Sequence, residues 1–302
     1  MRTRTKVLLA IAIWLGVAIL LGLAFGSEGK NEEFQPQNEF KLEPWISLKV
    51  AGIDLSVNKA VLYLFLASAL TVMTMTWIAN RMEQRPNRVQ TAAEVFYNLA
   101  RSNIAGGNMD PRFAARWFPF VGGLFFFIWF SNMIGFIPLP INTEETIDVF
   151  GIGFPALALY AATANLSVPL VLTIVVWFSY NFQGVREKGF IRYFRSWLPP
   201  GLEDMNPVGK AAIFVIEVLS HFVRLISLSV RLFANILAGH LLILFMAGGL
   251  AVLLGLAALG ALTFPMVLFF YLFEVVLVAT LQAFIFATLT AIYIGGATAE
   301  SH

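Results

Sequence analysis

The sequence predicts an all-α polytopic membrane protein, and three observations lead to that fold class. Hydrophobic residues make up 59% of the chain and charged residues only 13%, against about 25% charged residues in an ordinary soluble domain. Six apolar runs are long enough to cross about 30 Å of hydrocarbon. None of these runs alternates polar and apolar residues, as the strands of a membrane barrel do.

The apolar runs divide the chain into three parts. Run 7–26 follows the basic start "MRTRTK" and fits either a signal peptide, with small residues near a cleavage site, or an extra N-terminal anchor helix. A polar external segment, 27–58, comes next. The rest, 59–302, is predicted to be one membrane domain. Its spans are expected at 60–79, 117–136 and 152–180, and two longer helices at 211–247 and 265–296.

The two longer helices are predicted to form a steeply tilted C-terminal hairpin. Run 211–247 would be roughly 55 Å long as a helix, at about 1.5 Å per residue, and overshoots the hydrocarbon by about 25 Å. A mean tilt of about 20° does not absorb this excess. The glycine-rich apolar stretch after residue 247 is expected to hold the turn. A further amphipathic helix on the membrane surface is expected at "AAEVFYNLA", within 85–116.

The charges of the loops predict the orientation. Segment 80–116 holds six basic and three acidic residues, and segment 181–210 holds five and three. Segment 137–151 has three acidic residues and no basic one. The positive-inside rule therefore places the first two segments and the C-terminus in the cytoplasm, and the third outside. No organellar targeting peptide is evident, so a bacterial plasma membrane is expected.

The composition also excludes several kinds of function. The chain has no cysteine, which removes disulfides, thiolate metal sites and cysteine nucleophiles. Three histidines leave little material for a metal site, and no metal or other cofactor is expected. The net charge is +2 with the basic residues in loops, so no nucleic-acid partner is expected.

A polar stripe follows one face of the first long helix. Counted from Glu217, its residues come at offsets that follow a period of 3.6. A single arginine within a membrane costs about 2.5–3.5 kcal/mol on insertion scales, so this face must meet water or protein. The members of the stripe are Glu217, Ser220, His221, Arg224, Ser227, Arg231 and Asn235.

The two arginines of the stripe differ in their expected partners. Glu217 is close enough to pair with His221 or Arg224, so Arg224 fits both a structural and a functional role. Arg231 lies about 21 Å along the helix from Glu217, at about 1.5 Å per residue. Its partner is therefore expected elsewhere, in this chain or on another. A functional role is predicted for Arg231.

The last long helix carries fewer polar groups. Tyr271, Gln282 and Tyr293 repeat every 11 residues, which returns to nearly the same face. In a hairpin, Glu274 comes to a depth similar to that of His240. These two residues either exchange protons in a wet cavity or form a structural hydrogen bond.

Two motifs carry a resemblance to a known family. "SLSVRLFANILAGH" (227–240) and "LQAFIFATLTAIYI" (281–294) resemble subunit a of the F-type ATP synthase, and the similarity extends from about residue 45 to the C-terminus. The resemblance implies a proton-conducting stator subunit with two half-channels, which is not catalytic by itself. It implies as partners the ring of c subunits, the b subunits of the peripheral stalk, the rest of the complex and the lipid bilayer.

The resemblance also implies a role for each matching residue. Arg231 would face the c ring and prevent direct leakage between the half-channels. The residues implied around it are Asn235 and Gln282 beside it, His240 and Glu274 in the outer half-channel, Glu217 on the cytoplasmic side, and Tyr293 as the family's tyrosine on the final helix.

The chain departs from the family pattern at two places. Glu274 precedes Gln282 by eight residues, where the family has seven, which turns Glu274 by about 100° unless a local bulge corrects it. Asn165 and Ser167 stand where many relatives carry an acid and an asparagine. The outer half-channel is therefore expected to be less acidic.

Two other classes of membrane protein are alternatives. A secondary transporter usually has internal repeats and broken helices, and no repeat is visible here. A proton-pumping subunit of a respiratory complex is the other alternative, but such subunits tend to use several intramembrane lysines, which these apolar runs lack.

Overall fold

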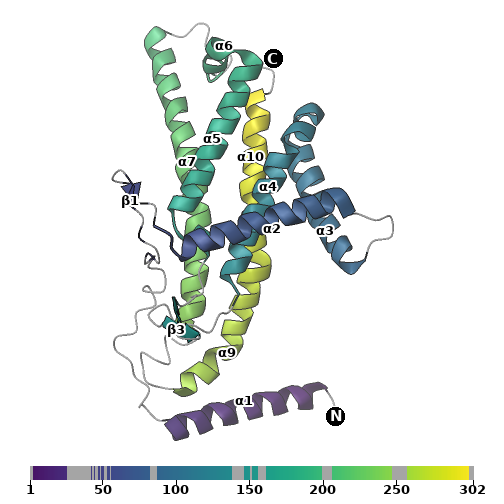
Figure 1. Ribbon diagram of the computed structural model, residues 1–302, viewed down its shortest axis with the longest axis vertical. Helices are drawn as coiled ribbons and strands as arrows, with labels where there is room; N and C mark the ends of the chain where they lie inside the picture. Colours follow the sequence, from purple (N-terminus) through teal and green to yellow (C-terminus); the bar gives the residue numbers. More distant parts are fainter. Residues whose placement is uncertain are drawn as a thin grey trace. The chain divides into compact units, whose positions relative to one another are not determined.

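The chain folds into a series of long helices (Figure 1). The computed structural model describes residues 3–25, 49–50, 53–54, 56–81, 87–137, 146–149, 152–155, 161–198, 206–246 and 257–298, with residues 42, 44 and 47. The α-helices are α1 (Thr3–Phe25), α2 (Lys59–Arg81), α3 (Arg88–Asn98), α4 (Pro111–Gly135), α5 (Ser167–Lys188), α6 (Phe190–Arg195), α7 (Pro207–Leu244), α9 (Ala257–Leu272) and α10 (Ala279–Thr298).

Five stretches of the described residues are helical, long enough and apolar enough to cross a membrane. They are Lys59–Asn80, Pro111–Gly135, Ser167–Lys188, Pro207–Leu244 and Leu262–Thr298. The predicted fold class, an all-helical polytopic membrane protein, is confirmed. The expected amphipathic stretch within 85–116 is also helical, as α3.

The predicted span 152–180 is wrong in its first half. Ile152–Pro155 forms strand β4, which pairs antiparallel with β3 (Thr146–Val149), and α5 begins only at Ser167. The composition of 152–166 is apolar, but Pro155 has no N–H to donate and disfavours a helical residue before it. The side-chain oxygen of Asn165 accepts a hydrogen bond from the backbone N–H of Ser167 at 3.0 Å, which forms a turn at the start of α5.

The last long helix begins earlier than predicted and changes its winding. It starts at Ala257 rather than at residue 265, and Pro265 lies inside α9. Between α9 and α10 lies a π-helical segment, η5 (Phe273–Val278). A second π segment, η2 (Leu99–Gly106), follows α3, and a 3-10 turn, η3 (Ala162–Ala164), precedes α5.

Parts of the predicted organisation fall outside the described residues. This holds for the turn expected at 247–256 and for most of the external segment 27–58, where only a small hairpin of β1 (Lys49–Val50) and β2 (Ile53–Asp54) is described in full. The first apolar run is helical, as α1, which fits both a signal peptide and an anchor helix.

The contacts within the chain define two compact units, and the second holds the larger described core. It comprises Leu62–Ile134, Ala161–Ala234 and Thr280–His302. Small residues line one face of α10, where Ala283, Ala287 and Ala291 are fully buried. Small side chains at a spacing of four let neighbouring helices approach closely. The indole N–H of Trp129 on α4 donates to the hydroxyl of Thr280 on α10 at 3.1 Å.

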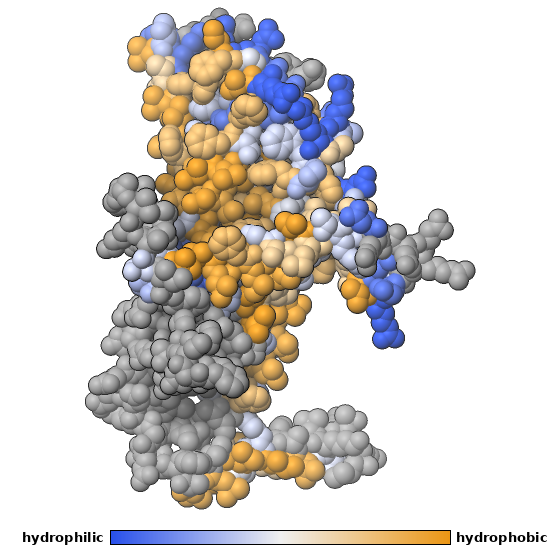
Figure 2. Space-filling view, in the orientation of Figure 1, coloured by the Kyte–Doolittle hydropathy of each residue, from blue (hydrophilic) through white to orange (hydrophobic). Residues whose placement is uncertain are grey.

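The surface of this unit is apolar where the helices are predicted to meet lipid. Figure 2 shows apolar side chains over the middle of α2 and α5, with hydrophilic residues around α6 and α3. Phe65 on α2 and Phe178 on α5 are among the exposed large residues. Such a surface is typical of helices solvated by hydrocarbon rather than by water.

The first unit comprises Met1–Val61, Gly135–Tyr160 and Asn235–Ala279. Within it α1 packs against α9. The C-terminal turns of α7, the end of α4 at Gly135 and the segment η5 also belong to this unit, and they hold two of the predicted site residues.

Candidate proton-pathway residues

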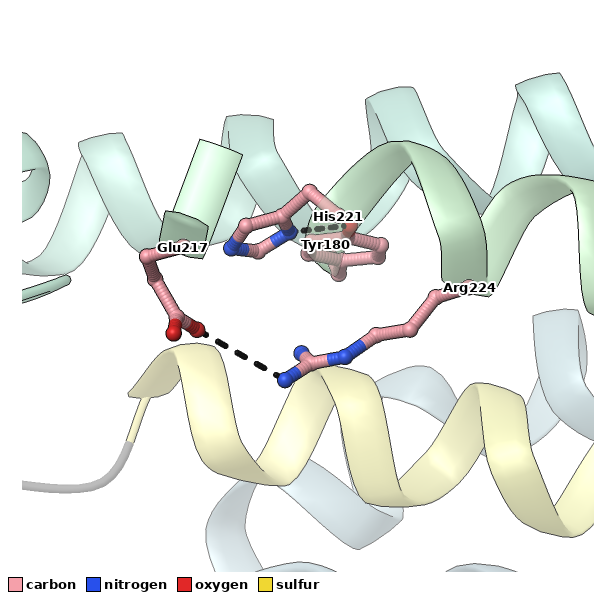
Figure 3. A network of polar contacts seen from close by, with 4 residues as sticks. All are labelled: Tyr180, Glu217, His221 and Arg224. Carbon is pink, nitrogen blue, oxygen red and sulfur yellow. Dashed lines mark hydrogen bonds and ion pairs between the residues drawn. The ribbon is translucent and has the colours of Figure 1, made fainter. Parts of the chain in front are cut away.

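Three predicted residues of α7 lie beside two tyrosines from other helices, and together they form what we call the Tyr180 cluster. Figure 3 draws all of its members except Tyr293. The cluster consists of Tyr180 on α5, Glu217, His221 and Arg224 on α7, and Tyr293 on α10. The tyrosine rings lie 5.8 Å apart between centroids. The second long helix contacts the first at this point through Tyr293 and Arg224, as a hairpin requires.

Within the Tyr180 cluster, Arg224 pairs with Glu217. A guanidinium nitrogen lies 3.6 Å from a carboxylate oxygen, and the guanidinium carbon lies 5.8 Å from the centroid of the Tyr293 ring. The side chain of Arg224 is 43% exposed and that of Glu217 is 30% exposed. An ion pair that water can reach contributes little to stability. This geometry supports the structural reading of Arg224 and leaves its charge available to the surroundings.

His221 and Tyr180 are the two most enclosed members of the cluster. His221 is 7% exposed, and its Nδ1 lies 2.8 Å from the hydroxyl of Tyr180. The ring of Trp197 stacks on the imidazole at 4.1 Å between centroids and an angle of 24°. A phenol hydroxyl can donate or accept, so the contact with Tyr180 is compatible with the neutral and the protonated ring of His221.

The helix α6 packs against Trp197, the residue that stacks on His221, through Tyr193, whose ring centroid lies 5.8 Å from that of the indole. Tyr193 is buried, and its hydroxyl donates to the side-chain oxygen of Asn181 at 3.0 Å. Burial raises the pKa of the Tyr193 phenol, and the charge of Arg224 opposes this shift. Tyr193 therefore remains a neutral donor at physiological pH and keeps α6 against α5.

Arg231 lies in a different environment on α7. It is exposed, and with Val223, Ile226, Ser227 and Val230 it lines a shallow hollow of about 380 Å³. No ion pair joins Arg231 to any other residue that the structure describes. Asn235, one turn further along, is exposed too. The predicted stripe thus presents an arginine on an apolar surface without a local acid.

Gln282 and Asn165 are held in less exposed places. Gln282 is 6% exposed on α10. Asn165, which was predicted to lie in a less acidic outer half-channel, is half-buried at the start of α5, where its side chain forms the turn described above. That hydrogen bond is a structural reason for an asparagine at this position.

The first unit holds the His240 cluster, which we define as Gly135, Phe136, His240, Tyr271 and Glu274. His240 is 2% exposed, and its two ring nitrogens each lie 2.9 Å from a backbone carbonyl oxygen, Nδ1 from that of Ile236 and Nε2 from that of Gly135. The ring of Phe136 stacks on it at 4.3 Å. The hydroxyl of Tyr271 donates to the carbonyl of Phe136 at 2.6 Å.

Glu274 lies in the π-helical segment η5. This segment affects the rotation by about 100° that was predicted for Glu274 from its spacing to Gln282. A π turn takes up one residue more than an α turn, which offsets the extra residue between Glu274 and Gln282. Glu274 is 9% exposed, and its carboxyl group packs against Gly239 of α7, where any Cβ would overlap it. One carboxyl oxygen, Oε2, has no hydrogen-bond partner among the described residues.

His240 and Glu274 are neighbours without a hydrogen bond between them in the described structure. Glu274 contacts the residue that precedes His240, while both nitrogens of His240 face carbonyl groups. A proton exchanged between them would need a rearrangement or a water molecule. Their roles in a half-channel stay a prediction.

Sequence reasoning missed Tyr180 and Trp197 beside His221, and it missed Gly135, Phe136 and Gly239 beside His240 and Glu274. The signal for Tyr180 was available, because a buried tyrosine within an apolar run usually finds a partner for its hydroxyl. Trp197 and Gly239 left no periodic signal. Among the described residues, no group of three or more histidine, aspartate or glutamate side chains could hold a metal ion.

The fold and these clusters define a multi-pass helical membrane protein whose two longest helical stretches carry ionisable side chains at several positions along their length. The family model of the ATP synthase A chain matches residues 61–295, and the chain belongs to this family, whose members act in proton transport and ATP synthesis at a membrane.

Relatives named ATP synthase subunit a cover most of the chain. The protein of Rubrobacter xylanophilus is 33% identical over 83% of this chain and 88% of its own length. The protein of Parvibaculum lavamentivorans is 32% identical over 93% of this chain and 100% of its own length. The protein of Paramagnetospirillum magneticum is 33% identical over 86% of this chain and 96% of its own length.

Proposed function

We propose that the chain is the proton-conducting stator subunit of a rotary ATP synthase, with Arg231 facing the rotor ring of c subunits. It supplies two half-channels and is not catalytic by itself. Its partners are the c ring, the b subunits and the remaining subunits of the complex. We place it in a bacterial plasma membrane, and the loop charges support a C-terminus in the cytoplasm.

The observation that carries this proposal is the setting of Arg231. A guanidinium does not lose its proton in proteins, so an exposed arginine on an apolar surface presents a permanent positive charge. When a protonated rotor carboxyl approaches, this charge lowers the carboxyl pKa and favours proton release. The same charge repels a proton that would pass directly from one half-channel to the other.

The two clusters are the candidate half-channels. The Tyr180 cluster includes Glu217 in the N-terminal half of α7, and the His240 cluster lies near the C-terminal end of the same helix. In the first, Tyr180 and His221 form a hydrogen bond through which a proton can pass. In the second, Glu274 offers a buried carboxyl oxygen without a partner among the described residues.

The first test is ATP-driven proton pumping in inverted membrane vesicles. Arg231→Ala, with the complex still assembled, is expected to abolish pumping while ATP hydrolysis by the detached catalytic head survives. Glu274→Gln is expected to slow pumping, because an amide cannot carry the proton. Val230→Ala is the matched control, since Val230 lines the same hollow. Normal pumping by Arg231→Ala would show that Arg231 is structural.

A further inference from the structure

The short helix α6 displays large apolar side chains outside the span that precedes it. Phe190 is 68% exposed and Ile191 is 82% exposed, although both follow the end of α5 at Lys188. Four cations surround them. We call this set the α6 surface: Arg186, Lys188, Phe190, Ile191, Arg192 and Arg195.

The orientation of α6 is set by contacts on its opposite side. The chain reverses at Gly189, whose φ of 80° lies in the region that favours glycine. The ring of Tyr193 then occupies the space beside Gly184 that a Cβ would need. Two residues span about 200° of a helix, so Ile191 and Arg195 both point away from the face that Tyr193 fixes. Their exposure therefore follows from the fold of this segment.

The charges of the α6 surface are not neutralised by the residues that the structure describes. Arg186, Arg192 and Arg195 are exposed and take part in no ion pair there. The acid within this stretch, Glu187, accepts a hydrogen bond from Gln183 at 2.9 Å. A cationic surface with protruding apolar side chains therefore lies directly at the end of a membrane span.

We propose that the α6 surface docks on the anionic headgroups of the lipid leaflet at which α5 ends. Phe190 and Ile191 enter the boundary between headgroups and acyl chains, as the apolar face of an interfacial helix does. The cations then lie at the level of the lipid phosphates, where each gains from the negative surface potential. This inference depends on α5 being a span, and it does not depend on the proposed function.

Anionic lipid is favoured over a protein partner by the combination of charge and position. A basic cluster immediately beside a membrane span is typical of lipid recognition. The cores of protein interfaces are depleted of charged residues, whereas here the two apolar side chains stand among four cations. The docked surface also supports the Tyr180 cluster, because Trp197, two residues after α6, stacks on His221.

The test uses a nitroxide label at Ile191→Cys in the assembled ATP synthase, because this chain has no other cysteine. The complex is reconstituted in vesicles of phosphatidylcholine with or without phosphatidylglycerol. Collisions of the label with oxygen, which concentrates in lipid, are compared with collisions with a water-soluble nickel chelate. The second variant adds Arg192→Gln and Arg195→Gln, and the matched control adds Arg88→Gln and Arg112→Gln, which are exposed elsewhere.

In vesicles with phosphatidylglycerol, the label is expected to collide more often with oxygen than with the nickel chelate. The Arg192→Gln/Arg195→Gln variant is expected to increase the share of collisions with the nickel chelate. At about 1 kcal/mol for each cation, the preference for the anionic surface falls roughly 30-fold. The control pair is expected to change nothing. A label that meets the nickel chelate freely in anionic vesicles overturns the proposal. A label shielded from both agents also overturns it, in favour of a protein partner.

Discussion

The two histidines of α7 differ in what their ring nitrogens meet. His221 contacts a tyrosine hydroxyl, which can donate or accept. Both nitrogens of His240 face carbonyl oxygens, which only accept. A neutral imidazole has a single N–H, so only the protonated ring of His240 donates to both carbonyls. A neutral ring with its N–H on Nε2 still donates to Gly135, so His240 joins α7 to the end of α4 with or without the second proton.

Replacing His240 is expected to destabilise this junction. His240→Leu removes the donor to the carbonyl of Gly135, and a buried acceptor left without a partner costs about 1–3 kcal/mol. The temperature at which the subunit leaves the detergent-solubilised complex should fall. Leu242→Ala, which trims an exposed side chain nearby on the same helix, is the control. An unchanged temperature for His240→Leu would mean that the two hydrogen bonds contribute nothing to stability.

The π-helical segment η5 changes where a count of residues places Glu274 on the helix. An α-helical extrapolation over eight residues turns Glu274 by about 100° from the family position, but η5 takes up the extra residue locally. A count of residues along a helix assumes the same number of residues in every turn, so it cannot predict a π turn. The predicted start of α5 at residue 152 was wrong for a similar reason. Hydropathy detects apolar residues, but it does not detect the backbone restrictions that Pro155 imposes.

Shortening η5 by one residue is expected to be tolerated. Deleting Val276, which is 64% exposed, should convert the π turn to α winding and leave Glu274 against Gly239. Deleting Ile292, which is exposed in the α-helical part, should rotate Tyr293 away from Tyr180 and Arg224. ATP-driven pumping should persist in the first variant and fail in the second. Loss of pumping in both would mean that η5 has a role beyond setting the register.

The sequence predicted those features that have a period or a composition, and missed those that join distant segments. The stripe from Glu217 to Asn235 was predicted because one helix carries it. The contact between His221 and Tyr180 joins residues 41 positions apart, and that between Gly239 and Glu274 joins two helices. Neither leaves a local pattern. The orientation in the membrane, in contrast, rests entirely on loop charges.

That orientation can be measured with single cysteines, since this chain contains none. Ser102→Cys is exposed in η2, within the basic segment 80–116. Thr143→Cys lies in the acidic segment 137–151. A membrane-impermeant maleimide should label Ser102→Cys in inverted vesicles and Thr143→Cys in intact spheroplasts, because basic loops stay in the cytoplasm. The reverse pattern would put Glu217 on the outer side and exchange the two proposed half-channels, while the charge of Arg231 would act on the rotor in either orientation.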